Sequence, residues 1–318
     1  MLLATVAIVV GIALLVWGAD RFVDGAASVA RNMRIPPMIV GLTIVSLGTS
    51  LPEIIVAAMA AWDGNRDLGI GNVIGSNIAN IGLVLGITAL IVPLTIKSMT
   101  LRREMPILLL VTFFAFALMA DGELSFADGV MLIIGLILLL AWIVRTGLKD
   151  RHDPLVEGLT ESIPEQMSMR RSILWFIIGL VLLIGSSRMV VWGAVEIAQY
   201  LGVSDLIIGL TIVAIGTSLP ELVASIASAL KNEADLAIGN VIGSNMFNLL
   251  AVLAMPGLIY PGVFAPEALL RDFPIMIAFT IALFVVSFAL KRGKVSRFEG
   301  FLLVSGFVAY LYMLYLQA

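Results

Sequence analysis

Two glutamates of this 318-residue chain, Glu53 and Glu221, are the residues whose placement most clearly calls for a chemical explanation. Each is the only charge in a long apolar run, 35–62 and 206–230 respectively. A charged side chain at the centre of a membrane helix costs about 2.5–3.5 kcal/mol on insertion scales. No lysine or arginine occurs at comparable depth, so an internal salt bridge is not available. A pair of protonated, hydrogen-bonded glutamates is one solution, but the sequence favours a bound cation as their partner.

The residues that precede each glutamate supply further oxygen ligands. Pro52 has no N–H and its ring clashes with the carbonyl four residues earlier, so the helix should break around Gly48–Thr49–Ser50. Helical side chains lean toward the N-terminus, which brings the Glu53 carboxylate back toward the freed carbonyls and hydroxyls. Residues 216–221 repeat this arrangement. Carboxylate, carbonyl and hydroxyl oxygens suit Ca²⁺ or Na⁺ rather than a soft transition metal.

Both glutamates belong to an internal repeat with a constant offset of 168 residues. Residues 41–53 read GLTIVSLGTSLPE and residues 209–221 read GLTIVAIGTSLPE, with 11 identities in 13 positions. Residues 67–77 (DLGIGNVIGSN) match residues 235–245 (DLAIGNVIGSN) at 10 of 11 positions. The chain is therefore predicted to consist of two related halves.

The second motif of each half combines small and polar residues. Its glycines stand four apart, a spacing that lets membrane helices approach closely. Ser76 and Asn80 are also four apart and share a helix face, as do Ser244 and Asn248. Such side chains often serve only as hydrogen-bond partners between helices. Their position beside the glutamate helices nevertheless favours ligand roles.

The elements that must position these residues are membrane spans. The chain is 60% hydrophobic and 13% charged, with a mean hydropathy of +1.09. Apolar runs of about 20 residues, enough to cross a bilayer, occur ten times. They cover residues 1–19, 35–62, 68–96, 105–120, 129–144, 172–187, 206–230, 236–266, 273–290 and 300–318. The predicted fold is an all-α polytopic membrane protein with ten transmembrane helices arranged as two inverted five-helix repeats.

The odd number of spans in each half explains the inversion, because the second copy must enter the membrane from the opposite side. We expect residues 1–146 to form the first five-helix repeat, 147–171 a cytoplasmic linker, and 172–318 the second repeat. Inverted-repeat transporters bind their substrate near the midplane between the repeats. Of the 19 lysines and arginines, only Arg66, Arg188 and Arg271 fall in connections predicted to lie outside. The positive-inside rule then predicts a plasma (inner) membrane protein with both termini outside.

GTSLPE at 48–53 and 216–221, each followed by GNVIGSN at 71–77 and 239–245, resembles the α-repeat signature of sodium/calcium exchangers. These belong to the cation/Ca²⁺ antiporter superfamily, and the resemblance is to the prokaryotic type. It implies a secondary active antiporter that exchanges Na⁺ for Ca²⁺ by alternating access. It also implies that spans one and six slide against a core formed by the other eight.

The resemblance further implies a central Ca²⁺ site flanked by Na⁺ sites. The Ca²⁺ ligands would be two carboxylates and two threonine carbonyls, and the Na⁺ ligands four serine hydroxyls and two further carbonyls. Two asparagines fall where the family places additional polar groups. In this order, the implied metal-binding residues are Glu53, Glu221, Thr49, Thr217, Ser50, Ser218, Ser76, Ser244, Ser46, Ala214, Asn80 and Asn248.

Asn248 departs from the pattern of some relatives, which carry aspartate at this place, including potassium-dependent members. The amide leaves two carboxylates in the site and argues against K⁺ co-transport. A charge of −2 is neutralised by one Ca²⁺, two Na⁺ or two protons, so a Ca²⁺/H⁺ antiporter is an alternative. An ion channel could use the same oxygens.

Composition narrows the other function classes. A net charge of −3 and a pI near 5.3 do not supply the basic face of a nucleic-acid binder. The absence of cysteine and the single histidine, His152, argue against disulfides, thiolate metal sites and most zinc enzymes. An intramembrane protease lacks its motifs here, so we expect no enzyme activity. We expect no resident cofactor: the partners are Na⁺, Ca²⁺ and the lipid bilayer, without a soluble protein partner.

Overall fold

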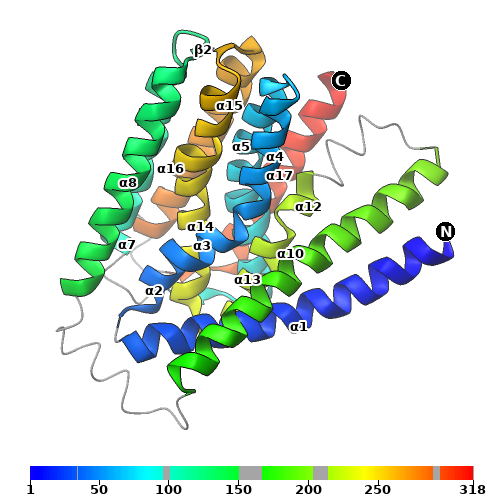
Figure 1. The fold of residues 1–318 in the computed structure, drawn as a ribbon, viewed down its shortest axis with the longest axis vertical. Helices are drawn as coiled ribbons and strands as arrows, with labels where there is room; N and C mark the ends of the chain where they lie inside the picture. The colour runs from blue at the N-terminus through cyan, green and yellow to red at the C-terminus, as the bar shows by residue number, and fades with distance from the viewer. Residues whose placement is uncertain (34, 96–100, 150–166, 203–213, 289–293, 318) are drawn as a thin grey trace.

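The computed structural model describes the chain except residues 34, 96–100, 150–166, 203–213, 289–293 and 318, and the described residues are mainly helical (Figure 1). The α-helices of the first half are α1 (Leu2–Met33), α2 (Pro37–Val40), α3 (Ser46–Thr49), α4 (Leu51–Trp62), α5 (Arg66–Ala79), α6 (Gly86–Ile91), α7 (Leu101–Met119) and α8 (Phe126–Lys149). Those of the second half are α10 (Met169–Tyr200), α12 (Ala214–Thr217), α13 (Leu219–Leu230), α14 (Ala234–Phe247), α15 (Ala254–Ile259), α16 (Phe273–Phe288) and α17 (Arg297–Gln317).

Four π-helical segments and two short strand pairs complete the described elements. The π-helical segments are η1 (Gly41–Val45), η2 (Asn80–Leu85), η5 (Asn248–Val252) and η6 (Ala268–Asp272). The strands are β1 (Leu94–Thr95), β2 (Glu123–Leu124), β3 (Gly262–Val263) and β4 (Lys294–Val295). β1 pairs with β4 and β2 pairs with β3, both antiparallel, so each pair joins one strand from each half of the chain.

The helices are those of a membrane protein. Seven described helices are long and apolar enough to cross a bilayer, and eight if Pro37–Thr49 and Leu51–Trp62 count as one span bent by 42°. The expected span 105–120 falls in the shorter apolar helix Glu104–Met119, and the expected span 206–230 is described only from residue 214 on, where it contains the shorter apolar helix Leu219–Leu230. By length and composition the described residues therefore give fewer than ten spans, and the count of ten stays a prediction.

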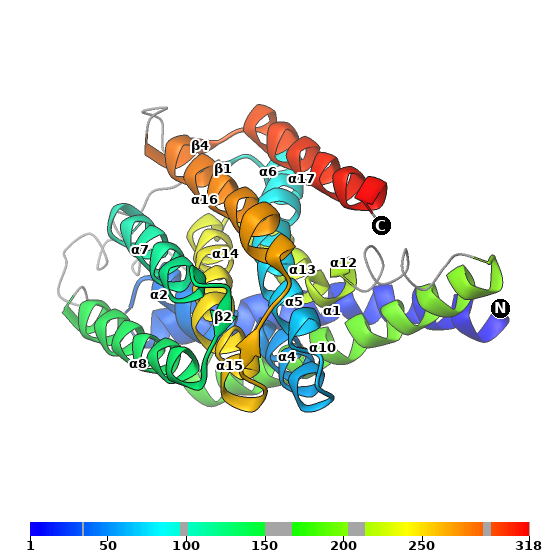
Figure 2. The same cartoon turned by 90° about the horizontal axis from the view of Figure 1, so that it is seen from above.

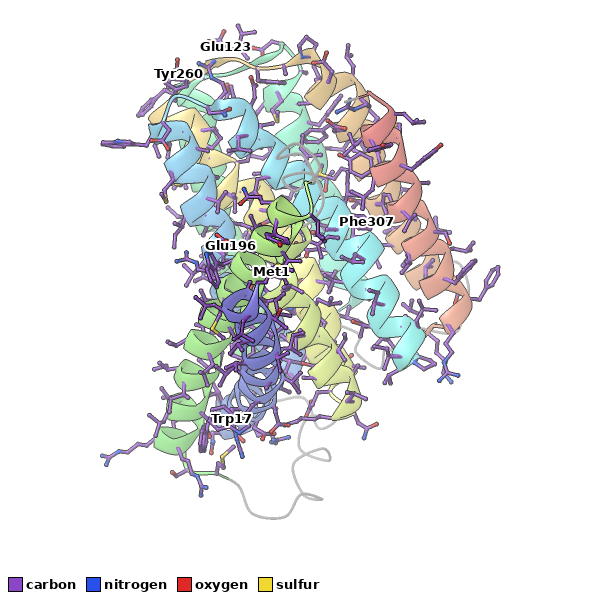
Figure 3. The ribbon with its side chains drawn as sticks, turned by 90° about the vertical axis from the view of Figure 1, so that its right-hand side faces the viewer. Met1, Trp17, Glu123, Glu196, Tyr260 and Phe307 are labelled. Atoms are coloured by element: carbon purple, nitrogen blue, oxygen red, sulfur yellow. The ribbon has the colours of Figure 1, made fainter. Side chains whose placement is uncertain are left out.

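The offset of 168 residues holds for the elements as well as for the motifs. α3, α4, α5, α6 and β1 correspond residue by residue to α12, α13, α14, α15 and β3, and η2 and η5 start at corresponding positions. Figure 3 shows Glu123 of β2 and Tyr260 close together at one end of the molecule, with Trp17 of α1 toward the other end.

The two longest helices, α1 and α10, form a pair that packs side by side. Figures 1 and 2 show this pair slanted across the steeper helices of the rest of the molecule. Each has 32 residues, which at about 1.5 Å per residue is longer than the hydrocarbon core is thick, so a strong tilt is expected. Glycines make the close packing possible: Gly25 lies against the Phe176 backbone, and Gly179 against the Phe22 backbone.

The centre of the molecule is formed by two continuous rods, α5–η2–α6 and α14–η5–α15. The apolar stretch within Ala234–Ile259 is buried and that within Arg66–Ile91 largely so, whereas in α1, α8, α10, α16 and α17 most residues of the corresponding stretch are not fully buried. Ile70 and Ile74 from the first rod and Ile242 and Met246 from the second belong to the same apolar cluster. The motif helices are therefore held at the centre by tight apolar packing, away from the surface that faces lipid.

We predict that Gly25→Ala lowers the melting temperature of the detergent-solubilised protein. A Cβ at Gly25 would lie 2.7 Å from Phe176 Cα and 2.8 Å from the Ser172 carbonyl oxygen, and such overpacking costs roughly 1–3 kcal/mol. The matched control is Gly185→Ala on α10, where no atom lies within 4 Å of the added Cβ. Equal melting temperatures for the two variants would contradict the packing.

Candidate ion-binding site

The helix break that Pro52 predicts lies at Ser50. α3 ends at Thr49 and α4 begins at Leu51, and Ser50 leaves helical geometry with ψ near 1°. The second half repeats the break at Ser218, where ψ is 5°. The first N–H groups of a helix have no partner within the helix, so a proline in the first turn removes no helical hydrogen bond. The break is therefore local, and the chain continues as the helices α4 and α13.

The break places each glutamate in the first turn of a new helix. Free N–H groups and the helix dipole favour negative charge at this position. Each carboxylate accepts a hydrogen bond from its own backbone N–H. The sequence therefore folds so that Glu53 and Glu221 are partly stabilised by backbone, although neither forms an ion pair with a lysine or arginine of the described chain.

The two carboxylates belong to one site. Figure 1 shows α4 and α13 running from the middle of the molecule toward opposite ends, so that their N-termini lie near the centre. Glu53 and Glu221 are each only 1% exposed. Their carboxyl groups are close enough to interact electrostatically, and the Asn240 amide connects the Thr49 hydroxyl to the Glu221 backbone carbonyl. Both therefore lie in the interior, across the boundary between the two halves, and neither faces lipid.

Asn80 and Asn248 lie where the central helices change from α-helical to π-helical geometry. Asn80 is the first residue of η2 and Asn248 the first of η5. π-helical turns within α-helices frequently occur at functional sites. The packing is reciprocal, because α13 contacts η2 while α4 contacts η5, and α14 contacts α3 while α5 contacts α12. Each half thus brings its second motif against the glutamate helix of the other half.

Buried oxygens without a hydrogen-bond partner are concentrated in this region. Leaving a buried polar group unpaired costs about 1–3 kcal/mol, so such a concentration indicates a place for an ion or water. In the described residues, the unpartnered oxygens of the two motifs are Ser50 Oγ, Glu53 Oε2, Asn77 Oδ1, Asn80 Oδ1, Ser218 Oγ, Glu221 Oε2, Ser244 Oγ and Asn248 Oδ1. All are hard ligands. No described group of three or more His, Cys, Asp and Glu side chains could hold a metal ion, so these carboxylates and neutral oxygens are the available donors.

The remaining expected ligands are placed as follows. Ser76 and Ser244 are buried on α5 and α14, one turn before the asparagines. Thr217 is half-buried on α12, and the Ala214 backbone opens that helix. Ser46 is buried on α3, and its carbonyl already accepts hydrogen bonds from the Ser50 N–H (2.9 Å) and the Thr49 hydroxyl (3.3 Å). Since a carbonyl has two lone pairs, both acceptor positions of the Ser46 carbonyl are already used.

Four further polar residues were not among the expected ligands: Asn77, Ser225, Asn240 and Asn245, each 1% exposed. Asn245 Oδ1 accepts a hydrogen bond from Asn80 Nδ2 at 3.3 Å, and Asn240 contacts Thr49 at 3.2 Å. The three asparagines lie within the repeated GNVIGSN motif, which was the available signal. Ser225 has Ala57 as its counterpart, so the repeat gives no signal for it.

The glycines of the second motif differ between the halves. A Cβ at Gly239 would lie 2.7 Å from the Met38 carbonyl oxygen, and one at Gly243 2.8 Å from Leu42 Cα, so both mark a close helix approach as expected. Within the described residues, Gly71 and Gly75 have no neighbouring atom within 4 Å of such a Cβ. The segment that would correspond to the Met38 and Leu42 contacts, 206–210, lies outside the described residues.

Membrane helices that meet around two buried carboxylates and a set of neutral oxygens define a membrane transporter for cations. The sequence model described as "Sodium/calcium exchanger protein" matches residues 3–146 and 171–316. The chain therefore belongs to the sodium/calcium exchanger family.

Known proteins of similar sequence and structure agree with this assignment. The chain is 48% identical to CaxA of Alkalimonas amylolytica over 320 residues, with 99% of each covered. It is 43% identical to the inner membrane protein YrbG of Escherichia coli, covering 99% of this chain and 98% of that protein. Its structure matches that of the sodium-calcium exchanger NCX_Mj with a TM-score of 0.85, at 33% identity and 98% coverage of both chains.

We predict that Ca²⁺ raises the melting temperature of the purified protein, because an ion that binds only the folded state stabilises it, by about 2.7 kcal/mol at 100 times its Kd. Glu53→Gln removes one of the two charges and should abolish most of this increase relative to a chelator. The control is Glu123→Gln, which neutralises an exposed carboxylate on β2. Equal stabilisation of both variants would show that Ca²⁺ binds elsewhere.

Proposed function

We propose that this protein is a secondary active antiporter that exchanges Na⁺ for Ca²⁺ by alternating access. The observation that carries the proposal is the pair of buried carboxylates, Glu53 and Glu221, surrounded by unpartnered hard oxygens. Relatives named as sodium/calcium exchangers add support: MaX1 of Methanosarcina acetivorans is 30% identical over 97% of both chains. On this proposal the protein carries ions and is not an enzyme, and it uses no resident cofactor.

The proposed architecture is ten spans in two inverted five-helix repeats, residues 1–146 and 172–318, joined by a linker at 147–171. Three observations support it. Element bounds repeat with the same offset as the motifs, both strand pairs join the two halves, and α4 and α13 run in opposite directions (Figure 1). We further propose an inner-membrane location with both termini outside, which the charge pattern and the name of the relative YrbG support.

The proposed Ca²⁺ ligands are Glu53, Glu221 and the carbonyls of Thr49 and Thr217. The proposed Na⁺ ligands are the other residues that the sequence analysis named. Among these, Ser50, Ser218 and Ser244 have buried hydroxyls without a hydrogen-bond partner in the described chain, which supports their role as ligands. With an amide at position 248, the site carries a charge of −2. One Ca²⁺ or two Na⁺ neutralise it, and uncompensated charge at the midplane is costly, so exchange between the two sides is favoured for the loaded protein.

The crossing pair α1–α10 is the proposed moving part. Most residues in the apolar stretches of α1 and α10 are not fully buried, and the two helices pack closely on each other, whereas the central rods are largely buried. A rigid pair that slides over a fixed core would open the site alternately to each side, as is expected for inverted-repeat transporters.

A Ca²⁺/H⁺ antiporter is the alternative that the same observations favour next, because two protons also neutralise two carboxylates. Vesicles separate the two proposals. Ca²⁺ uptake driven by a pH gradient in Na⁺-free buffer would support proton coupling, and uptake that requires internal Na⁺ would support sodium coupling.

We predict that vesicles containing the purified protein and loaded with Na⁺ take up labelled Ca²⁺, and that Glu53→Gln and Glu221→Gln each reduce this uptake to the level of empty vesicles. Each substitution removes one of the two charges that balance Ca²⁺. Glu123→Gln on β2 serves as the control with unchanged uptake. Uptake retained in both glutamate variants would refute the assignment of the site.

A further inference from the structure

The buried carboxamide of Asn240 links three elements of the site. Its Oδ1 lies 3.2 Å from Thr49 Oγ1 on α3. Its Nδ2 lies 3.2 Å from Ser225 Oγ and 3.5 Å from the Glu221 carbonyl oxygen, both on α13. Asn240 itself is on α14 and 1% exposed. It therefore contacts two of the proposed ion-binding residues, one from each half of the chain.

The neighbours of Asn240 determine which way its amide faces. The Glu221 backbone carbonyl can only accept a hydrogen bond, so the NH₂ group must face α13 and Oδ1 must face Thr49. Oδ1 also only accepts, so the Thr49 hydroxyl donates to it. Thr49 is, however, also within hydrogen-bond reach of the Glu221 carboxylate. The Ser46 carbonyl oxygen lies 3.3 Å from Thr49 Oγ1 as well, so one hydroxyl proton has three competing acceptors: Asn240, Ser46 and Glu221.

We propose that Asn240 is a positioning residue for the ion site, which rests on the proposed function. When a cation binds the Glu221 carboxylate, the Thr49 proton is held by Asn240, and the lone pairs of Thr49 Oγ1 face the ion. Asn240 also holds the first turn of α13 through the Glu221 carbonyl. It thereby sets the geometry in which Glu221 and Thr49 meet the ion.

The counterpart of Asn240 makes no such link through its amide nitrogen. Asn72 is the counterpart of Asn240, but Ala57 stands where the second half has Ser225. Asn72 is only half-buried, and its Nδ2 has no hydrogen-bond partner in the described chain. Asn72 is therefore a matched control for the hydrogen bonds that Asn240 Nδ2 donates to α13.

The test compares Asn240→Ala, Ser225→Ala and Asn72→Ala in Ca²⁺ uptake by vesicles and in melting temperature with and without Ca²⁺. Losing two hydrogen bonds to the site should raise the KM for Ca²⁺ about tenfold in Asn240→Ala, and losing one about threefold in Ser225→Ala. The maximal rate should change less than the KM. Asn72→Ala should leave the KM within twofold of the wild type.

Two results would overturn the positioning role. One is a lower melting temperature in Asn240→Ala with an unchanged KM and an unchanged Ca²⁺-induced stabilisation, which would mean purely structural packing. The other is an equal rise of KM in Asn72→Ala. Wild-type uptake in the same vesicles tests the proposed function separately, and the melting experiment reports ion binding even if no exchange occurs.

A second, independent observation concerns charges at the ends of the spans. Lys231, which follows α13, lies 2.7 Å from Asp20 Oδ1 and 2.6 Å from Asp24 Oδ1 on α1. Arg31 on α1 lies 3.1 Å from Glu233 Oε1. The three α1 residues are spaced by four and seven positions and so share one helix face. These ion pairs connect the C-terminal half of α1 to the segment between α13 and α14.

The other half carries the same pair with the charges exchanged. By the offset of 168, Asp20 corresponds to Arg188 on α10, and Lys231 corresponds to Asp63, the residue after α4. Both are exposed, and neither makes an ion pair with a described residue. The packing of the two long helices differs between the halves in the same way. α1 packs extensively on α13, but α10, its counterpart, has no comparable contact with α4 in the described chain. α10 packs instead on α3, α12 and α13.

We infer that Asp20, Asp24 and Lys231 form one of two alternate ion-pair clasps, and that Arg188 and Asp63 form the other. This rests on the proposed alternating access. In inverted-repeat transporters the two halves exchange conformations between the two states. The contact that α1 makes with α13 in the conformation described here should therefore be made by α10 with α4 in the opposite state. Arg188 then comes to Asp63 as Asp20 comes to Lys231. Each clasp closes one side of the membrane while the other side is open.

The chain contains no cysteine, so introduced cysteine pairs can report each clasp. Because a disulfide requires Cα atoms closer than a lysine ion pair brings them, a reducible bifunctional thiol reagent is used. It should cross-link Asp20→Cys/Lys231→Cys in the conformation described here, and Asp63→Cys/Arg188→Cys in the opposite one. Both cross-links should block Ca²⁺ uptake reversibly, with recovery on reduction. Changing the bound ion should speed one cross-link and slow the other. The four single-cysteine variants, treated with the same reagent, should keep their uptake.

Failure of Asp63→Cys/Arg188→Cys to cross-link under Na⁺, Ca²⁺ and ion-free conditions, while Asp20→Cys/Lys231→Cys does, would overturn the second clasp. Cross-linking of both pairs with the same ion dependence would overturn their alternation. Cross-linking is read on gels without transport, so failure of the clasp and failure of the proposed function are distinguishable.

Discussion

The structure depends on one constraint: two carboxylates are held together in the buried interior, where the described chain offers them no ion pair with a basic residue. Glu53 and Glu221 are each 1% exposed and interact electrostatically. Two like charges in such surroundings are unfavourable unless a cation is added. The protein keeps them there with helix N-termini and own-chain N–H donors, which reduce the cost without neutralising the charge. A ring of neutral oxygens around uncompensated carboxylates is the chemistry of a site that binds and releases hard cations.

The irregular backbone around the site follows from this constraint. A continuous α-helix would pair every backbone oxygen internally and leave none for an ion. The breaks at Ser50 and Ser218 and the π-helical turns that begin at Asn80 and Asn248 all occur where oxygens must face the centre. Such backbone is tolerated within a membrane only when it is buried in protein or lines a cavity. The tightly packed rods on either side of the breaks supply that burial.

The local features could be predicted from the sequence, and the contacts between the halves could not. Pro52 predicted the break because proline acts through its own ring and missing N–H. The π-helical starts at Asn80 and Asn248 have no sequence signal that we recognise, although the residues themselves were expected. The Asn240–Ser225 hydrogen bond and the Lys231 ion pairs depend on tertiary packing. The count of ten spans stays a prediction, because part of the expected span 206–230 lies outside the described residues.

Charge balance and end contacts have different roles in the proposed cycle. The amide at position 248 keeps the site at −2, so one Ca²⁺ or two Na⁺ bring it to zero, and an empty site is held back by the cost of moving charge through hydrocarbon. A third Na⁺ would leave +1, on which the membrane potential acts with about 2.3 kcal/mol per 100 mV. The ion pairs of Lys231 are partly exposed at the span ends, where such pairs contribute little each. Ion occupancy therefore decides whether the two states interchange, and the end charges bias only which state is preferred.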